Sequence, residues 1–369
     1  MRSLALMVNE YQFWMGGILA TQLEEITDDP KKVDQGGFWA ALISFEGVRT
    51  FARFSKVEER EFPQSDWEPI GTSWRSSLNR KSYIDYVSRI REAISLGGVY
   101  QVNACRQLSN QIDESSSELS GLFSKLLDEN PAPYASYLNI PGLEIASASP
   151  ELFLSRSGKM IKTSPIKGTI REQETSFGEK DKAENLMIVD LLRNDVSRVA
   201  QAGSVAVPDL FHVESYPTVH QMISTVTAQL DPGKTVADLL RAIYPCGSIT
   251  GAPKIRAMEV IGDVEPEPRG IYTGSIGRID ANGDAAFNVA IRTLHLPKGA
   301  TVATLGLGGG IVADSQVDEE WAECLAKGRF VADPRCFDLI ETMLFDPEQG
   351  MPLLNRHLER MQASADALG

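Results

Sequence analysis

The sequence predicts an α+β fold with two lobes. Short strand-like segments joined by tight turns fill residues 134–163 and again residues 271–307, a rhythm typical of antiparallel meanders and not of alternating βαβ units. Helical periodicity marks the segments around them, and the longest predicted helix covers residues 181–199. Two strand-rich halves separated by helices therefore indicate a two-lobed sheet structure.

The N-terminal residues 1–74 are predicted to be rich in strands. Two strand-like runs, residues 37–45 and 48–54, flank the dipeptide Glu46-Gly47, which favours a hairpin.

A helix, a strand and a second helix follow. The first helix is expected from Lys81, where apolar residues recur at helical spacing, with Ser82 and Asp85 as a capping box. A strand over residues 99–108 and a helix over residues 116–127 come next.

Strands dominate the rest of the chain. They are expected at residues 134–140, 143–149, 152–156, 159–163, 205–215, 219–227, 271–280, 286–296 and 301–307. Asn282-Gly283 is the strongest hairpin signal among their connections. Helices are expected at residues 181–199, 237–242, 253–261 and 315–327, the last with Ser315 and Asp318 as its capping box.

Charge and composition exclude several classes of function. The net charge of −14 at pH 7 argues against non-specific binding to nucleic acid and against docking on anionic membranes. The four cysteines have no metal-binding spacing, which is typical of reduced thiols inside the cell. No apolar run approaches the roughly 20 residues of a membrane span, and the first residues lack a signal-peptide pattern. We therefore expect a cytoplasmic protein with no nucleic-acid or membrane partner.

One lysine lies in a rigid bend. Lys167 stands between Pro165 and Gly168, both turn residues, after the strand predicted to end at Thr163. A lysine held beside Ile166 is poorly placed for solvation, and desolvation can leave its amine uncharged and nucleophilic near neutral pH. The alternative is an ordinary surface lysine in a loop.

Two predicted helices each carry a pair of carboxylates. Asp181 and Glu184 lie three residues apart on one helix, as do Glu320 and Glu323 on another, so each pair projects from one helix face. If the two faces meet, four acidic groups converge. Such a site needs a cation, and oxygen-only ligands favour Mg²⁺. The alternative is two solvated acidic faces.

Several further motifs occur in a fixed order along the chain. They are Ser149-Pro150-Glu151, Pro165 to Thr169, Ala183 to Asp190 with Arg193 to Asp195, Gly247 to Glu259, Gly270 to Gly277, Ala290 to Thr293 and Gly308 to Lys327. Together they resemble the chorismate-utilising enzymes, the family of anthranilate and isochorismate synthases. The resemblance implies a two-lobed α+β fold with antiparallel sheets packed face to face and helices outside. It also implies a chorismate-binding catalytic core over residues 75–331, completed by residues 1–74.

The resemblance implies how chorismate, a dianion, is held. Mg²⁺ on the four carboxylates would take the ring carboxylate. Arg292, Tyr272 and Lys327 would hold the enolpyruvyl carboxylate, for which the planar fork of an arginine is suited. The further expected substrate contacts are Thr250, Gly308, Gly309 and Gly310. The alternatives are a helix-capping role for Thr250 and its neighbour Ser248, and glycines that only form a bulge.

The resemblance also implies the chemistry. Lys167 would attack ring carbon C2 and expel the C4 hydroxyl, and Glu151 would act as the general acid that protonates this poor leaving group. Ammonia would then add at C4 and displace the lysine, leaving the pyruvyl ether intact. His220 matches an active-site histidine of the family, with a purely structural histidine as the alternative. Asn103 is expected to belong to the scaffold.

Two positions discriminate among the reactions of this family. Members that add water carry a lysine where this chain has Gln101, and a glutamine cannot deprotonate water. Most members carry alanine at position 167, whereas a lysine there is typical of those that make 4-amino-4-deoxychorismate for para-aminobenzoate and folate. The expected activity is this amination, in the aminotransferring class of enzymes. The alternatives are the first component of anthranilate synthase and a non-catalytic partner of an amidotransferase.

Two expectations concern partners and the end of the chain. No glutaminase motif occurs, so ammonia is expected from a separate glutamine amidotransferase chain. Residues 332–369 lie outside the synthase pattern, and within them residues 336–344 and 357–369 resemble the opening of a pyridoxal-phosphate lyase of the aminotransferase fold. This tail is interpreted as a linker and a lyase stub without pyridoxal chemistry; the alternative is an ordinary hairpin and helix.

Overall fold

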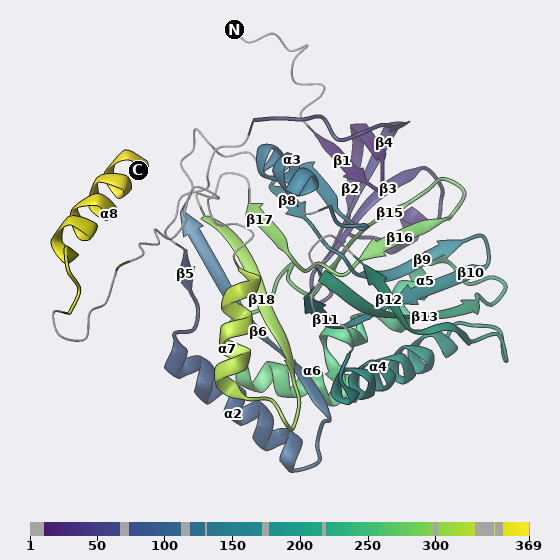
Figure 1. Cartoon of the computed structure of the whole chain (residues 1–369). Helices are drawn as coiled ribbons and strands as arrows, with labels where there is room; N and C mark the ends of the chain where they lie inside the picture. Colours follow the sequence, from purple (N-terminus) through teal and green to yellow (C-terminus); the bar gives the residue numbers. More distant parts are fainter. Residues whose placement is uncertain are drawn as a thin grey trace, which may run out of the picture. The chain divides into compact units, whose positions relative to one another are not determined.

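The computed structural model describes residues 11–66, 74–111, 119–129, 131–171, 177–215, 219–297, 302–328, 343 and 350–368. The chain forms two compact units, Met1–Phe330 and Val331–Gly369 (Figure 1). None of the described helices is both long and apolar enough to cross a membrane. The boundaries expected at residues 74 and 331 within the synthase pattern stay predictions.

The strands all belong to the first unit. They are β1 (Gln12–Met15), β2 (Ile18–Thr27), β3 (Phe38–Ile43), β4 (Arg49–Glu59), β5 (Arg75–Ser76), β6 (Gln101–Gln111), β7 (Ser136–Ile140), β8 (Leu143–Ser147), β9 (Leu152–Ser157), β10 (Met160–Ser164), β11 (Ile166–Arg171), β12 (Ala206–Ser215), β13 (Val219–Gln229), β14 (Gly251–Ala252), β15 (Ser275–Ile279), β16 (Ala285–Asn288), β17 (Thr293–Pro297) and β18 (Val302–Ile311).

The helices of the first unit lie mostly on the faces of the sheet. They are α1 (Pro30–Val33), α2 (Arg80–Ser95), α3 (Ser120–Glu129), α4 (Glu179–Ser197), α5 (Val236–Ile243), α6 (Lys254–Val264) and α7 (Val317–Lys327). Helix α4 packs on β11 and β13, α6 on β6, and α7 on β18 (Figure 1). These contacts bring α4 and α7, which carry the predicted acidic pairs, to strands that border the site described below.

Antiparallel pairing links all the described strands into one continuous network. Its order is β6–β18–β17–β8–β7–β1–β2–β4–β3–β15–β16–β9–β10–β13. Strands β5 and β14 also pair with β6, and β11 and β12 with β13. The predicted α+β class with antiparallel meanders is confirmed, and so are the hairpins β3–β4 and β15–β16.

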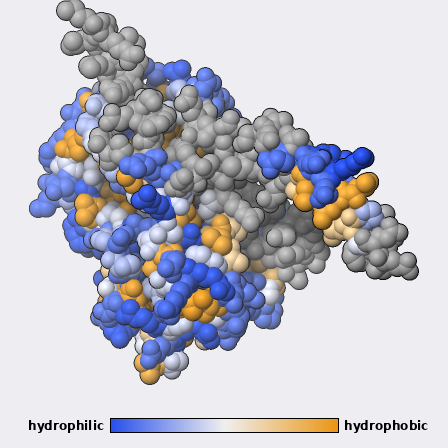
Figure 2. All heavy atoms as spheres, turned by 90° about the vertical axis from the view of Figure 1, so that its left-hand side faces the viewer, coloured by the Kyte–Doolittle hydropathy of each residue, from blue (hydrophilic) through white to orange (hydrophobic). Residues whose placement is uncertain are grey.

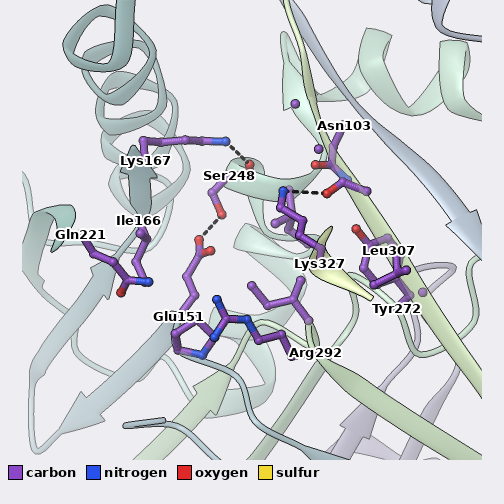
Figure 3. Close-up of a pocket in the computed structure, with 17 residues that line it drawn as sticks. Asn103, Glu151, Ile166, Lys167, Gln221, Ser248, Tyr272, Arg292, Leu307 and Lys327 are labelled. Atoms are coloured by element: carbon purple, nitrogen blue, oxygen red, sulfur yellow. Dashed lines mark hydrogen bonds between the residues drawn. The ribbon is translucent and has the colours of Figure 1, made fainter. Parts of the chain in front are cut away.

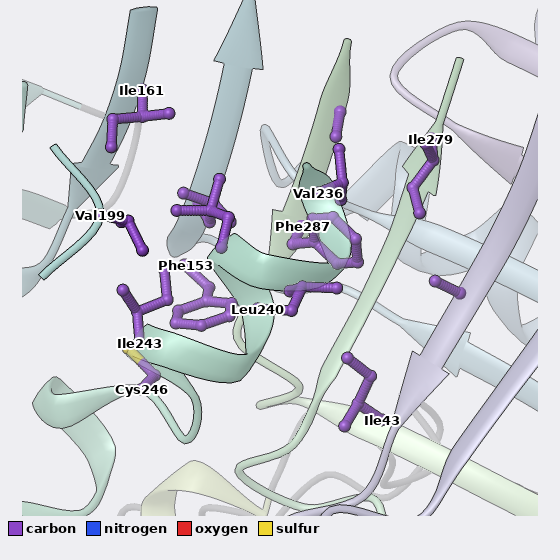
Figure 4. Close-up of a cluster of buried hydrophobic side chains, with 14 of the residues drawn as sticks. Ile43, Phe153, Ile161, Val199, Val236, Leu240, Ile243, Cys246, Ile279 and Phe287 are labelled. Atoms are coloured by element: carbon purple, nitrogen blue, oxygen red, sulfur yellow. The ribbon is translucent and has the colours of Figure 1, made fainter. Parts of the chain in front are cut away.

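Two large apolar clusters, and a smaller one between α4 and β13, form the described core of the first unit. One gathers side chains of β1, β2, β4, β7 and β8 around Phe13 and Phe54. The other large cluster includes the inner face of helix α5, whose Leu240 and Ile243 are buried in one cluster with Phe153 and Phe287 of β9 and β16 (Figure 4). Arg241 on the same helix is exposed, so α5 covers the core with one face, as expected for a helix that lies outside the sheet.

Caps and strand breaks differ from the predicted pattern in three places. Helix α2 is capped by Asn79, whose side chain accepts a hydrogen bond from the Ser82 backbone N–H at 2.9 Å, and not by Ser82. The N-cap residue of α7 is Gln316 and not Ser315, whose hydroxyl donates a hydrogen bond to Glu320 at 2.7 Å. The strand predicted over residues 286–296 is broken between β16 and β17, where Arg292 has φ of +49°.

The second unit contains helix α8 (Leu354–Leu368). Among its described side chains Leu354 and Leu358 are exposed, as are Met351 and Leu353 before the helix, and Figure 2 shows hydrophobic side chains gathered along one side of it. Nearly all of the lyase-like stretch 336–344 lies outside the described residues, so that resemblance stays a prediction.

Candidate active site

A cavity of about 190 Å³ lies where strands distant in sequence meet the loop after helix α5 (Figure 3). We call it the inner cavity. It is lined by Asn103, Pro150, Glu151, Ile166, Lys167, Gln221, Ser248, Ile249, Tyr272, Ile291, Arg292, Gly306, Leu307, Gly308, Gly309, Gly310 and Lys327. A second cavity of about 710 Å³, the outer cavity, adjoins it, because Ile166, Lys167, Arg292, Gly310 and Lys327 line both.

Strand β11 places Lys167 on the wall shared by the two cavities. The pairing of β11 with β13 shifts register after Ile166. Gly168 in this bulge has φ of +84°, a conformation that favours glycine. The predicted bend is therefore present, but it lies within a strand that continues to Arg171 and not in a loop.

Burial keeps the Lys167 amine from holding its proton as firmly as a surface lysine does. Its Nζ donates a hydrogen bond to the Ser248 carbonyl oxygen at 3.0 Å and forms no ion pair with a described carboxylate. Desolvation lowers the pKa of Lys167, and the negative charge of Glu151 offsets this only in part. The lowered pKa and the neutral carbonyl partner both favour the uncharged amine, which is the form that acts as a nucleophile.

Glu151 lies under the same loop and is buried, with 4% of the residue exposed. Its backbone carbonyl accepts a hydrogen bond from Val289, which fixes the start of β9 against the sheet. The Ser248 hydroxyl donates to Glu151 Oε1 at 2.5 Å. Burial raises the pKa of Glu151, while Ser248 and Lys167 act in the opposite direction. A carboxyl that keeps its proton to higher pH suits a general acid.

Ser248 is held in place by a buried ion pair beneath its loop. Lys254, at the start of α6, donates to Asp195 at 2.6 Å and to the carbonyls of Ile243 and Pro245. The loop between α5 and α6 is thus tied at both ends. Ser248 then bonds Lys167 through its carbonyl and Glu151 through its hydroxyl, so that one residue orients both groups.

Two cationic side chains besides Lys167, those of Arg292 and Lys327, line the inner cavity. Arg292 lines both cavities and makes no side-chain hydrogen bond or ion pair with the described residues. Lys327 donates to the Gly308 carbonyl at 2.9 Å and pairs with Glu323 at 2.7 Å. Tyr272 is buried beside Asn103, which hydrogen-bonds its hydroxyl. An unpaired guanidinium next to a lysine is a suitable anchor for a carboxylate.

The glycines of β18 differ in how closely they are packed. The strand pairs with β6 in unbroken register from Val302 to Ile311, so these glycines do not form a bulge. A Cβ on Gly308 would lie 1.8 Å from the Ala104 carbonyl oxygen, and one on Gly310 would lie 2.1 Å from the Gln101 amide. A Cβ on Gly309 would lie 3.4 Å from Glu320 Oε2, which is an ordinary contact.

All four predicted metal ligands line the outer cavity. Asp181 and Glu184 project from α4, and Glu320 and Glu323 project from α7. Burial raises the pKa values of Glu184 and Glu320, and repulsion from Glu323 adds to both shifts. The acidic faces of α4 and α7 therefore line one cavity, and Glu184 on one helix is repelled by Glu323 on the other.

The four side chains offer only carboxylate oxygens, the ligand type that Mg²⁺ prefers. They do not converge on one coordination sphere in the described residues. Among the described residues, no three acidic, histidine or cysteine side chains lie close enough together to hold a metal ion. Glu323 is paired with Lys327, Glu320 accepts from Ser315, and Asp181 accepts from the Gly178 N–H at the start of α4. Four repelling carboxylates around one cavity match an oxygen-only cation site, with Mg²⁺ as the ion that keeps waters between itself and some ligands.

The structure places His220 outside both cavities. Its ring Nδ1 lies 2.9 Å from the Ser215 hydroxyl on the exposed side of the β12–β13 hairpin. Adjacent strand residues point to opposite faces, so the next residue, Gln221, lines the inner cavity instead. Strand alternation indicates that only one of these two neighbours can line the cavity, but the sequence does not say which one.

Thr250 and Asn103 also differ from expectation. Thr250 is fully buried away from both cavities, and its hydroxyl donates to the Cys246 carbonyl at 2.7 Å, so it stabilises the loop rather than touching a ligand. Asn103, expected in the scaffold, lines the inner cavity. Its neighbour Gln101 is buried with both amide atoms unpaired behind Gly310; no pattern in the sequence distinguishes these two positions on β6.

Comparison with known proteins assigns the family. Residues 31–333 match the family described as chorismate binding enzyme. The chain belongs to this family.

Its relatives include enzymes of two named kinds. The chain is 41% identical over 307 residues to aminodeoxychorismate synthase component 1 of Escherichia coli (strain K12), covering 80% of this chain and 66% of that protein. It is 39% identical over 281 residues to an anthranilate synthase component 1 of Haloarcula marismortui, covering 72% of this chain and 56% of that protein. The chain thus spans at most about two thirds of the length of these relatives.

A solved structure supports the fold. The crystal structure of anthranilate synthase component I from Streptococcus pneumoniae superposes with a TM-score of 0.72 at 24% identity, covering 87% of this chain and 89% of that chain. At this identity the likeness concerns the fold alone.

Proposed function

We propose that this chain is component 1 of an aminodeoxychorismate synthase, which converts chorismate and ammonia to 4-amino-4-deoxychorismate. One observation carries the proposal. Lys167 lines the inner cavity with a neutral hydrogen-bond partner, and the same serine bonds the buried Glu151. The names and identities of relatives such as the Escherichia coli protein support the same reading.

The first half-reaction forms a bond to the protein. Uncharged Lys167 Nζ attacks ring carbon C2, the two ring double bonds shift, and the C4–O bond breaks. Glu151 gives its proton to the departing oxygen, which leaves as water, and the lysine nitrogen loses one proton to solvent. The pKa directions of both groups favour this step, since burial leaves one amine less protonated and one carboxyl more protonated than in water.

The second half-reaction reverses the electron shift. Ammonia attacks C4, the double bonds return to their original positions, and the C2–N bond to Lys167 breaks. The incoming nitrogen loses a proton as the lysine nitrogen regains one. The ether that carries the enolpyruvyl group is untouched, so no pyruvate is released.

Substrate binding would divide between the two cavities. Arg292 and Lys327 would hold the enolpyruvyl carboxylate, with Tyr272 beside them. Asp181, Glu184, Glu320 and Glu323 would hold Mg²⁺ in the outer cavity, in part through water. When bound, Mg²⁺ would neutralise the ring carboxylate and help fix the ring opposite Lys167. Ammonia would come from a separate glutamine amidotransferase chain in the cytoplasm.

Product analysis tests the proposal. The protein is incubated with chorismate, Mg²⁺ and ammonium, and the product is identified by mass and by its ultraviolet spectrum. We expect 4-amino-4-deoxychorismate without pyruvate. Without ammonium, the intact protein should gain the mass of chorismate less one water, on the peptide that carries Lys167. Anthranilate together with pyruvate would instead assign the chain to anthranilate synthesis.

A further inference from the structure

Gln221 brings an unpaired amide into the inner cavity. The side chain is only 4% exposed and lines the cavity, yet its Oε1 has no hydrogen-bond partner among the described residues. A buried amide oxygen without a partner lowers stability. A ligand that donates a hydrogen bond at this point would remove that penalty.

The sheet fixes where this amide points. Gln221 lies in β13, with the backbone of Thr169 opposite it in β11 and that of Glu214 opposite it in β12. A strand paired on both sides has little freedom to turn its side chains over. Figure 3 shows Gln221 with Ile166, on the side of the cavity opposite Tyr272 and on the same side as Lys167.

The other polar side chains of the inner cavity serve different partners. Arg292, Lys167 and Lys327 are cationic donors, suited to anionic oxygens. Glu151 Oε1 is bonded to Ser248, and its other oxygen would carry the proton in the proposed reaction. Among the polar side-chain atoms that line the inner cavity, Gln221 Oε1 is the one that is buried without a hydrogen-bond partner in the described part of the chain.

The substrate of the proposed function offers one matching group. Chorismate carries two carboxylates and an ether oxygen, which only accept hydrogen bonds, and a single hydroxyl, on C4, which donates. Ammonia, which takes the place of that hydroxyl, also donates. A neutral acceptor suits both groups because an acidic side chain there would hold the nitrogen as ammonium, which has no lone pair for attack.

We propose that Gln221 forms the subsite for the group on ring carbon C4, accepting a hydrogen bond first from the C4 hydroxyl and then from the incoming ammonia. This inference rests on the proposed function. It makes Gln221 a positioning residue, which selects chorismate by its hydroxyl and orients the amine for attack.

A binding experiment isolates the first contact from turnover. Chorismate and an analogue with hydrogen in place of the C4 hydroxyl are titrated calorimetrically, with Mg²⁺ and without ammonium, into Lys167→Ala protein with and without Gln221→Leu. Removing the hydroxyl should weaken binding about 3- to 10-fold when Gln221 is present, the effect of one neutral hydrogen bond, and less than 2-fold when it is leucine. An equal loss in both backgrounds overturns the proposal.

A kinetic experiment tests the second contact. In otherwise unchanged full-length protein, Gln221→Leu should raise KM for ammonia about 3- to 10-fold, and Gln221→Asn should restore part of it. Gln229→Leu makes the same change at an exposed position of the same strand, and should leave the KM for ammonia unchanged. If KM for ammonia is the same in wild type and Gln221→Leu, Gln221 does not position the amine.

The outcomes separate this inference from the proposed function. If the wild type binds chorismate but makes no 4-amino-4-deoxychorismate, the proposed function fails while the calorimetric comparison still decides the hydroxyl contact. If amination proceeds but neither the hydroxyl nor the ammonia measurement responds to Gln221→Leu, the proposed function stands and the subsite is wrong. Should Gln221→Leu fail to fold by circular dichroism, Gln221→Met replaces it in both experiments.

Discussion

The inner and outer cavities adjoin, but their ionisable side chains are paired differently. In the inner cavity Lys167 and Glu151 meet through Ser248, a neutral residue, and burial shifts the pKa of each towards its uncharged form. In the outer cavity charges meet directly, since Glu323 pairs with Lys327 and repels Glu184. The inner cavity is suited to proton transfer and nucleophilic attack, and the outer cavity is suited to holding a cation.

A second buried lysine, Lys254, shows that burial alone does not make a reactive amine. Lys254 is about as enclosed as Lys167, but it donates to Asp195 and to two carbonyl oxygens. The ion pair at 2.6 Å and the two backbone hydrogen bonds occupy the Lys254 amine, so its role is structural. The feature that distinguishes Lys167 is the absence of an ion-pair partner among the described residues, together with its place on the cavity wall.

The largest expected effect removes the inner nucleophile. Lys167→Ala should lower kcat for amination by on the order of 10⁴-fold or more, because the covalent step has no substitute. Binding of Mg²⁺ and chorismate should persist, since the outer carboxylates and Arg292 are untouched. Single-turnover product analysis and calorimetry measure the two properties separately. Amination at the wild-type rate would rule out the lysine adduct.

The next effect concerns Glu151 and the pH profile. Glu151→Gln should reduce kcat by about 10²- to 10⁴-fold, the usual contribution of a general acid. In the wild type the rate should fall at low pH as Lys167 gains a proton, and at high pH as Glu151 loses one, giving a bell-shaped profile of the coupled pair.

Replacing Glu151 removes one of these two titrations. The rate of Glu151→Gln should rise with pH through the lowered pKa of Lys167 and then level off. A descending limb that survives unchanged in this variant would assign the high-pH titration to another group. Stopped assays between pH 5 and 10, with the free ammonia concentration held constant, make the comparison.

Sequence patterns predict several residues of the two cavities, but not the strand order that brings them together. The acidic pairs at i and i+3 on two helices, and the lysine beside Gly168, follow from helical spacing and turn chemistry. The structure places all of them on the two cavities. The strand order was not predictable, because pairing of β6 with β18 joins residues about two hundred positions apart.

The differences from expectation in the site have the same origin. His220 and Gln221 are neighbours, and only the register of β13 against β11 and β12 decides which one enters the cavity. Thr250 and Ser248 differ likewise, because the loop tied by Lys254 turns one hydroxyl to Glu151 and the other to a backbone carbonyl. Local sequence carries neither register nor loop orientation.

A smaller effect tests the outer cavity. Glu320→Gln should raise the Mg²⁺ concentration needed for half-maximal activity about 10-fold or more, by removing one carboxylate from the proposed cation site. Glu319→Gln changes the adjacent, exposed carboxylate on the same helix and should leave that concentration unchanged. If chelation of Mg²⁺ leaves wild-type activity intact, the four carboxylates have another role.

The smallest effect separates packing from ligand contact within one strand. Gly308→Ala would place a Cβ 1.8 Å from the Ala104 carbonyl oxygen, so the paired strands must shift, and the free energy of unfolding should fall by about 1–3 kcal/mol.

The Cβ that Gly309→Ala adds would instead point toward two side chains that line the outer cavity, with Glu320 Oε2 at 3.4 Å and Lys327 Nζ at 3.7 Å as its nearest atoms. Its unfolding free energy should change by less than about 1 kcal/mol, while its requirement for Mg²⁺ rises because a methyl group crowds the carboxylates. Urea titrations followed by tryptophan fluorescence, combined with the Mg²⁺ assay, test both variants. Equal losses of stability at the two positions would mean that β18 is constrained by sheet packing along both faces, and that the outer cavity places no separate demand for glycine at position 309.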